Sequence, residues 1–287
     1  MININNLFFS CKSERIDEKI ILNNINLSIE SGQSVILAGN NGSGKTLLFK
    51  VITGEIIPLI GNIKIDGKNI TEFSKTELAQ TISMVNGKLE NFIVNNLTFI
   101  ENIYLYTMQH NKISMINGID KARKLSLIDD IKKMDLGIDI DSIATKKVSE
   151  LPNYYKHLLL ILIAIVNNPK ILILDDIFAD IDVNDLEYVF PVVKKICDLK
   201  KFTVILSTDN TYIIGKICDR IIVLSNGIIV FDEKSDNNLD IQKITDMFNH
   251  HLKKALMSLS SKCPLYITKQ EHGDATPVKQ TTTKVEK

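Results

Sequence analysis

Apolar and polar residues alternate along the first third of the chain in the pattern of half-buried β-strands. The alternation is clearest over residues 20–29, where almost every second side chain from Ile21 to Ile29 is apolar. Residues 34–38 form a short apolar run, and residues 61–68 lead into an Asp-Gly turn, a further strand signal. We therefore predict that residues 1 to about 86 are mostly strand.

The period of the apolar positions becomes helical from about residue 97 to residue 151. Residues 158–166 are apolar on every side, which predicts a buried helix. Two apolar helix faces are expected before it, the first formed by Ile100, Ile103, Tyr104 and Thr107, and the second by Ala122, Leu125, Ser126 and Ile128.

Strands and helices alternate in the rest of the pattern. Strands are predicted at residues 170–174 and 203–206, with a helix around residues 183–199 between them. The turn Ser225-Asn226-Gly227 lies between two apolar runs and predicts a hairpin. This alternation indicates an α/β fold with a parallel sheet, into which the helical stretch of about residues 88–165 is inserted as a lateral subdomain.

The C-terminal residues separate into two segments. Residues 241–261 are amphipathic at helical spacing, and we favour a helix packed on the preceding domain over one that contacts a membrane or partner. Residues 262–287 are rich in Thr, Lys and Gln, a composition that predicts disorder.

Composition excludes several classes of protein. The 34 basic and 34 acidic residues balance, which argues against a nucleic-acid clamp. The longest apolar run has nine residues, about half of what a membrane span needs, and no signal peptide is visible. The four cysteines have no metal-type or disulfide-type spacing, so buried or free thiols in a reducing cytosol are expected.

One glycine-rich segment fits the phosphate-binding pattern G-x-x-x-x-G-K-[ST]. It lies between a predicted strand and a predicted helix, where its backbone N–H groups can approach phosphate oxygens. Lys45 is expected to reach the β- and γ-phosphates, and the Thr46 hydroxyl to hold Mg²⁺. The nucleotide-binding residues are predicted to be Gly39, Asn40, Asn41, Gly42, Ser43, Gly44, Lys45 and Thr46.

A second segment supplies the carboxylates that such a site needs. Residues 171–174 are four consecutive apolar residues followed by Asp175 and Asp176. A buried strand that delivers a carboxylate to a Mg²⁺ ion has this form. We therefore predict that Asp175 joins Thr46 in holding the metal.

These segments, with three others, resemble the ATP-binding subunit of ATP-binding-cassette (ABC) transporters over roughly residues 1–250. The other matches are residues 96–103, the Ala179–Asp182 segment and residues 219–227. The resemblance implies a P-loop NTPase domain with an N-terminal antiparallel β subdomain. It also implies ATP and Mg²⁺ as cofactors, a membrane permease as partner, a dimer of cassettes, and a cytoplasmic location at the inner face of a membrane. Residues 231–248 resemble importers of amino-acid-like solutes.

Four family motifs are altered in this chain. The signature LSGGQ aligns with Leu151-Pro152-Asn153-Tyr154-Tyr155, in which Pro152 lacks an N–H and the next residues prevent close backbone approach. Asp176 replaces the glutamate that orients water, and Asp209 replaces the switch histidine. Asn86-Gly87 stands where a glutamine is expected. The catalytic candidates are thus Lys45, Asp176, whose side chain is one methylene shorter than glutamate, and Asp209 at the position of the switch histidine.

The alterations predict ATP binding with weak or partner-dependent hydrolysis. One alternative is a catalytically inactive pseudo-ATPase that acts as a nucleotide-binding scaffold or as the degenerate half of a heterodimer. A superfamily member that acts on nucleic acid is disfavoured by the neutral charge and by the single visible cassette.

Overall fold

The computed structural model describes residues 1–13, 16–111, 121–210, 213–214 and 216–235. The chain divides into two compact units, Met1–Lys243 and Ile244–Lys287. The amphipathic helix expected at residues 241–261 and the disordered tail expected at residues 262–287 lie outside the described residues.

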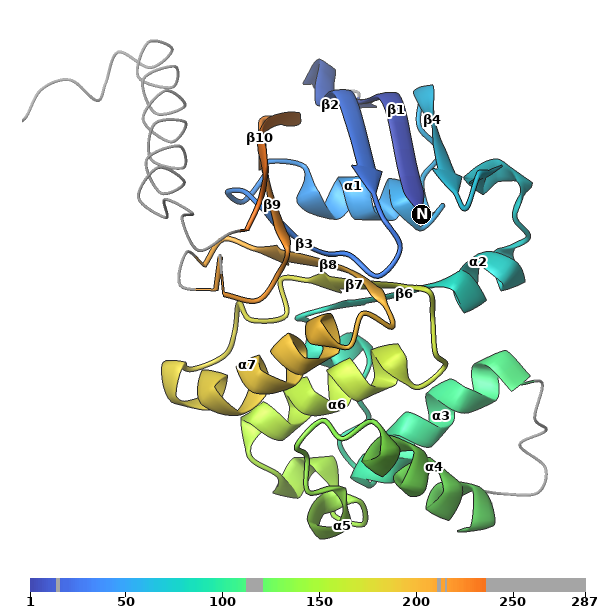
Figure 1. Ribbon diagram of the computed structural model, residues 1–287, viewed down its shortest axis with the longest axis vertical. Coiled ribbons are helices and arrows are strands. Elements are labelled where there is room, and N and C mark those ends of the chain that lie inside the picture. Colours follow the sequence, from blue (N-terminus) through green and yellow to red (C-terminus); the bar gives the residue numbers. More distant parts are fainter. Residues whose placement is uncertain (14–15, 112–120, 211–212, 215, 236–287) are drawn as a thin grey trace, which may run out of the picture. The chain divides into compact units, whose positions relative to one another are not determined.

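A six-stranded sheet forms the centre of the first unit (Figure 1). Its order is β10-β9-β3-β8-β7-β6, and all neighbouring strands are parallel except β10, which runs antiparallel to β9 in the expected hairpin. The predicted parallel α/β sheet is thus confirmed. The strands are β3 (Ser34–Ala38), β6 (Ile82–Asn86), β7 (Ile171–Asp175), β8 (Thr203–Thr208), β9 (Arg220–Ser225) and β10 (Ile228–Lys234).

A second, antiparallel sheet has the order β2-β1-β4-β5, which confirms the expected N-terminal β subdomain. Helix α1 lies between this sheet and the central one (Figure 1), and its Leu48 and Phe49 are fully buried. One hydrophobic core therefore joins both sheets through the helix that follows the phosphate loop. The elements are β1 (Ile2–Ser13), β2 (Ile16–Ile29), α1 (Lys45–Ile52), β4 (Ile60–Ile65), β5 (Lys68–Asn69) and the 3₁₀ helix η1 (Ile70–Glu72).

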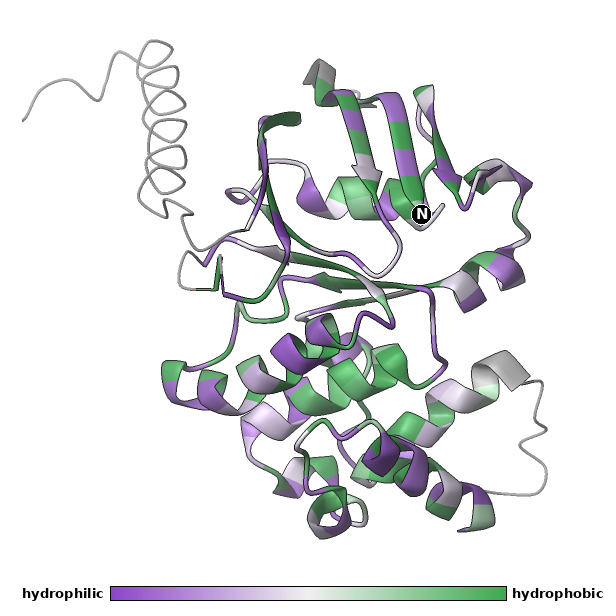
Figure 2. Cartoon of the chain, viewed as in Figure 1, coloured by the Kyte–Doolittle hydropathy of each residue, from purple (hydrophilic) through white to green (hydrophobic). Residues whose placement is uncertain are grey.

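Helices cover the other face of the central sheet (Figure 1). Helix α6 is green, and thus hydrophobic, along most of its length in Figure 2, because its residues from 158 to 165 are all buried apolar residues as predicted. The helices between β6 and β8 are η2 (Leu89–Asn91), α3 (Phe99–Asn111), α4 (Lys121–Lys133), α5 (Ile140–Ile143), η4 (Val148–Glu150), α6 (Asn153–Ile165) and α7 (Val183–Asp198).

The buried faces of α3 and α4 differ in how well the sequence predicts them. Ile100, Ile103 and Tyr104 of α3 are buried as expected. In α4 the predicted face is wrong, because Leu125 is 56% exposed while Leu127 and Ile131 are buried. The two buried residues lie one helical turn apart, and this helix is too polar for its few apolar side chains to define a face from the sequence alone.

Helix α2 (Lys75–Thr81) interrupts the region predicted to be mostly strand. Its N-terminus is a capping box: Ser74 Oγ accepts from the Glu77 N–H, and the Glu77 carboxylate accepts from the Ser74 N–H. No helix in the described part of the chain could cross a lipid bilayer.

Candidate nucleotide-binding site

The phosphate loop leaves the carboxyl end of β3 and enters α1, as the sequence predicts. Parallel pairing places the carboxyl ends of β7 and β8 at the same edge of the sheet. The predicted carboxylates at the end of β7 are thereby brought beside the loop, although more than 120 residues separate the two segments.

The backbone of the loop requires glycine at two positions in particular. A Cβ on Gly39 would lie 2.4 Å from the Leu224 carbonyl oxygen and 2.7 Å from Ser43 Oγ. Gly44, which precedes α1, has φ +108°, a conformation that other residues rarely adopt. Ser43 Oγ is buried and has no hydrogen-bond partner among the described residues. An orphaned hydroxyl inside a glycine-rich curl fits a site built for an external acceptor or donor.

The Lys45 ammonium lies across the loop. Its Nζ donates to the Gly39 carbonyl at 2.6 Å and approaches the Asn40 carbonyl at 3.5 Å. Within the described part of the chain, no ion pair draws this ammonium away from the loop. It is therefore held where a phosphate group bound by the loop would meet it.

Thr46 and Asp175, the two predicted metal residues, are in direct contact. Thr46 Oγ1 donates to Asp175 Oδ2 at 2.9 Å, and Asp175 is 4% exposed. Hydroxyl and carboxylate oxygens are the ligands that Mg²⁺ prefers, so this pair fits a magnesium site. The other carboxylate oxygen, Asp175 Oδ1, accepts from Ser207 Oγ at 2.6 Å. Ser207 was not among the predicted site residues, because only the pairing of β7 with β8 places it there.

Asp176 follows β7 in a left-handed conformation with φ +49°. Burial raises the pKa of its carboxyl, and the positive charge of Lys45 opposes this shift. The Asp176 N–H donates to Ser207 Oγ at 2.8 Å, which holds the turn after β7 against β8. Asp176 therefore follows the metal residue Asp175 directly and is held against β8 by Ser207.

Two of the other segments aligned with family motifs, Asp209 and Asn86-Gly87, also border this edge of the sheet. Asp209 follows β8 directly and is exposed to solvent. The Gly87 N–H donates to the Asp175 carbonyl at 3.1 Å, so the Asn86-Gly87 segment is packed against the end of β7. The Asn86 side-chain oxygen accepts from the Lys88 N–H at 3.1 Å and is thus engaged locally.

The signature segment lies at the start of α6, and aromatic rings cover it. Pro152 precedes the helix without a side-chain cap. The Tyr154 ring stacks on the Tyr188 ring of α7, with centroids 4.5 Å apart, and its centroid lies 4.3 Å from that of Tyr155. A hydrogen bond with Tyr155 contributes most to raising the pKa of Tyr154 to about 12. Tyr154 and Tyr155 thus give the start of α6 a bulky aromatic surface.

His157 lies one turn further along α6 and is only 1% exposed. Neither ring nitrogen has a hydrogen-bond partner among the described residues. Burial lowers the pKa of His157, with the backbone of Ile177 the first opposing influence. The folded protein therefore disfavours the protonated imidazole.

We expect this histidine to make stability depend on pH. Below about pH 6.5, His157 is protonated in the unfolded chain but stays neutral in the folded chain. The free energy of unfolding therefore falls as the pH is lowered, until the pH reaches the pKa of His157 in the folded state. One proton gives a slope of at most about 1.4 kcal/mol per pH unit. Urea unfolding at about pH 7.5 and about pH 5.5 measures it, and His157→Leu should flatten the curve. If the free energy of unfolding changed equally with pH in the unmodified chain and in His157→Leu, the pH dependence would not come from His157.

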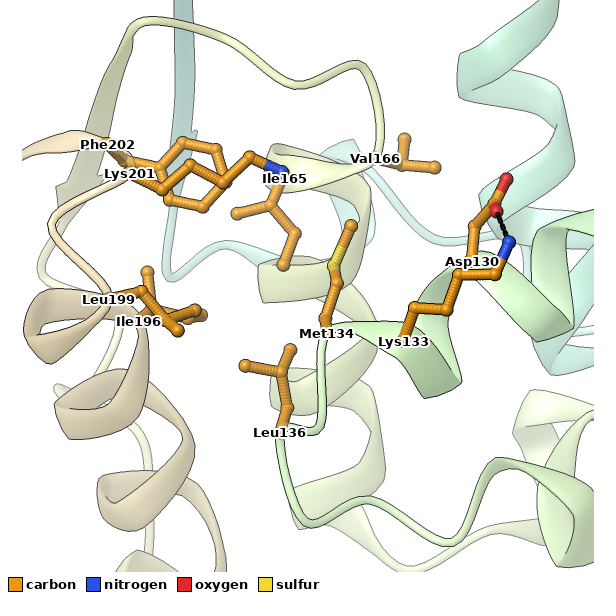
Figure 3. A pocket seen from close by; sticks show the side chains of 10 residues that line it. All are labelled: Asp130, Lys133, Met134, Leu136, Ile165, Val166, Ile196, Leu199, Lys201 and Phe202. Carbon is orange, nitrogen blue, oxygen red and sulfur yellow. Dashed lines mark hydrogen bonds and ion pairs between the residues drawn. The ribbon is translucent and has the colours of Figure 1, made fainter.

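A pocket of about 430 Å³ lies away from this site, at the ends of β7 and β8 where these strands begin (Figure 3). It is mostly apolar, and Asp130 and Lys133 at its rim pair with each other at 2.9 Å. The remaining lining residues are Met134, Leu136, Ile165, Val166, Ile196, Leu199, Lys201 and Phe202. The pocket and the phosphate loop thus lie at opposite ends of the same strands.

A strand, a glycine-rich curl with a lysine, and a hydroxyl paired with a buried carboxylate define a P-loop nucleotide-binding protein. Comparison with known proteins identifies the class further. The sequence profile described as "ABC transporter" matches residues 22–179, and the chain belongs to this family.

Individual relatives agree with this assignment. The chain is 29% identical to the energy-coupling factor transporter ATP-binding protein EcfA1 of Ligilactobacillus salivarius, over 83% of this chain and 79% of that protein. It is 27% identical to the tyrosine transport ATP-binding protein of Clostridioides difficile, over 87% of this chain and 99% of that protein. A dimeric ATP-binding cassette bound to ADP and phosphate has the same fold, with a TM-score of 0.68 and 23% identity over 83% of this chain and 100% of that one.

Proposed function

We propose that this protein binds MgATP at the loop from Gly39 to Thr46 and couples it to a membrane permease as the ATP-binding subunit of an ABC transporter. The observation that carries the proposal is the 2.9 Å contact between Thr46 and Asp175 beside the curled loop. Binding magnesium there would place the two metal ligands and the Lys45 ammonium around one triphosphate. The metal would neutralise phosphate charge when bound.

Different residues of this chain would bind the phosphates and the metal. The loop N–H groups and the N-terminus of α1 would face the phosphates, and the Lys45 ammonium would leave the Gly39 carbonyl for phosphate oxygens. Thr46 and Asp175 would hold the metal. Asp176 would orient water poorly, because its side chain is one methylene shorter than the glutamate of the family.

We infer weak or partner-dependent hydrolysis from the altered motifs. The Tyr154 ring stacks on Tyr188, and Pro152 has no backbone N–H to donate. This segment would therefore make few hydrogen bonds to a nucleotide held by a second cassette. The Asp209 carboxylate would repel a γ-phosphate. The alternative is a catalytically inactive subunit that binds nucleotide as a scaffold or as the degenerate half of a heterodimer, and the aromatic signature segment favours it.

Partners and solute are proposed from the relatives. Proteins named as energy-coupling factor and tyrosine transport ATP-binding proteins support a permease partner at the inner face of a membrane and an amino-acid-like solute. The dimeric relative supports pairing with a second cassette, identical or different. No nucleic-acid partner is proposed.

Co-expression with a permease encoded beside this chain tests the transport role. We expect the two proteins to co-purify in detergent and the permease to change the rate of ATP turnover. An active transporter should lose turnover with Asp175→Asn. A complex that binds ATP without measurable turnover, with or without a second cassette, would support the scaffold alternative. Failure of the chain to bind either ATP or the permease would contradict both.

A further inference from the structure

Ser207 is a buried polar residue to which none of the motifs assigns a role. It lies in β8, is 0% exposed, and its Oγ contacts both acidic residues at the end of β7. We propose that Ser207 is the positioning residue of the magnesium site: its hydroxyl holds the Asp175 carboxylate in the orientation in which it binds the metal. This inference rests on the proposed binding of MgATP.

The hydrogen bonds around Ser207 have a defined direction. Its Oγ accepts from the Asp176 N–H at 2.8 Å and lies 2.6 Å from Asp175 Oδ1. A hydroxyl carries a single proton, and a carboxylate can only accept it. The second carboxylate, Asp176 Oδ1, is further away at 3.2 Å. The Ser207 proton is therefore donated to Asp175.

Both oxygens of the Asp175 carboxylate then have a donor. Oδ1 receives the Ser207 proton, and Oδ2 receives the Thr46 proton at 2.9 Å. With one donor on each side, the carboxylate plane is fixed relative to Thr46. Rotation of the carboxylate would break at least one of these bonds, at a site where Asp175 is almost fully buried.

The donor is carried by a rigid element. Ser207 lies one position beyond the β7–β8 ladder pair Leu174–Leu206, inside the central sheet. On the opposite side, Asp175 pairs with Asn86 of β6. A ligand held between two strands keeps its position more closely than one held by a loop. In the described part of the chain, the hydrogen bonds of Ser207 Oγ go to Asp175 and Asp176 and none goes to the phosphate loop.

This arrangement separates metal binding from nucleotide binding. Removing the hydrogen bond that orients a metal ligand lowers metal affinity by about 10-fold to 100-fold. The loop and Lys45 would hold the phosphates, and among the described residues no hydrogen bond joins either of them to Ser207 Oγ. Ser207→Ala should therefore weaken the metal and leave metal-free ATP binding unchanged.

The experiment measures two affinities on the full chain. ATP binding in excess EDTA is measured by equilibrium dialysis, and Mn²⁺ binding at saturating ATP is measured by electron paramagnetic resonance. For Ser207→Ala we expect Mn²⁺ affinity to fall about tenfold or more, with ATP affinity in EDTA within about twofold of the unmodified chain. Ser207→Thr, which keeps a hydroxyl, should recover most of the Mn²⁺ affinity.

Thr203→Val is the matched control. Thr203 is a buried hydroxyl residue at the other end of β8, where it accepts from the Gly32 N–H at 3.1 Å. Its loss should lower thermal stability to a similar degree without changing Mn²⁺ affinity. Unchanged Mn²⁺ affinity in Ser207→Ala, an equal loss in Thr203→Val, or a parallel loss of ATP affinity in EDTA would each overturn the positioning role. If Ser207→Ala does not fold, Ser207→Cys provides the same comparison. An unmodified chain that binds no ATP in either condition would overturn the proposed function as well.

Discussion

Lys45→Ala is expected to lower the affinity for ATP by about 100-fold. A charge-assisted hydrogen bond contributes about 1.5–3 kcal/mol, so two such bonds to phosphate oxygens contribute about 3 kcal/mol at the lower end of that range, which corresponds to roughly that factor. The ammonium already lies over the loop, 2.6 Å from the Gly39 carbonyl, so little rearrangement is needed before it meets a phosphate. Isothermal titration with ATP and Mg²⁺ measures the change.

Lys50→Ala is the control for this prediction. Lys50 lies in the last turn of α1, away from the loop, and its removal changes the net charge by the same amount. We expect it to bind ATP like the unmodified chain. Equal affinities of the unmodified chain and Lys45→Ala would show that the loop does not hold nucleotide, and the proposed function would then be wrong.

Restoring the altered catalytic positions is expected to raise ATP turnover by about 100-fold or more. The proposed variant combines Asp176→Glu and Asp209→His with a restored signature, Pro152→Ser, Asn153→Gly, Tyr154→Gly and Tyr155→Gln. Misplacement of a reacting group by about 1 Å costs on the order of 100-fold, so Asp176→Glu should contribute most. Turnover is measured as phosphate release at saturating MgATP.

The contribution of Asp209 follows from its exposure. Two unit charges about 5 Å apart repel by roughly 3 kcal/mol at an effective dielectric of about 20, but by less than about 1 kcal/mol in water. Because Asp209 is exposed, the lower figure applies, and its replacement by histidine should gain less than tenfold from charge alone.

Two variants delimit this prediction. Adding Asp175→Asn to the restored chain should abolish the gained turnover, because the metal ligand is lost. The signature substitutions alone should lower stability by about 1 kcal/mol, the usual contribution of an aromatic pair such as Tyr154–Tyr188. If the unmodified chain already turns over ATP as fast as the restored one, hydrolysis is not weakened and that part of the proposal is wrong.

Local spacing was sufficient to predict the phosphate loop and the strand that carries Asp175. Both depend on short stretches in which the backbone conformation and the chemistry are set by neighbouring residues, such as the glycines before Lys45. Helix α6 was predictable for a related reason, since eight consecutive buried apolar residues, 158–165, can only be placed inside the protein. The spacing of Ser74 and Glu77 is that of a capping box, and it also predicts the helix α2.

Other features depend on contacts between segments that are distant in the sequence. The buried face of α4 is defined by what its Leu127 and Ile131 pack against, and a polar helix carries too little pattern to reveal it. The stacking of Tyr154 on Tyr188 requires α6 and α7 to lie side by side.

The sequence by itself therefore determined that this protein has a P-loop with its lysine, hydroxyl and strand-borne carboxylate, because these residues lie at fixed local spacings. Only the tertiary structure decided how the carboxylate is held. Ser207 comes within 2.6 Å of Asp175 because β7 and β8 are parallel neighbours in one sheet, and strand pairing across 32 residues is a property of the folded chain.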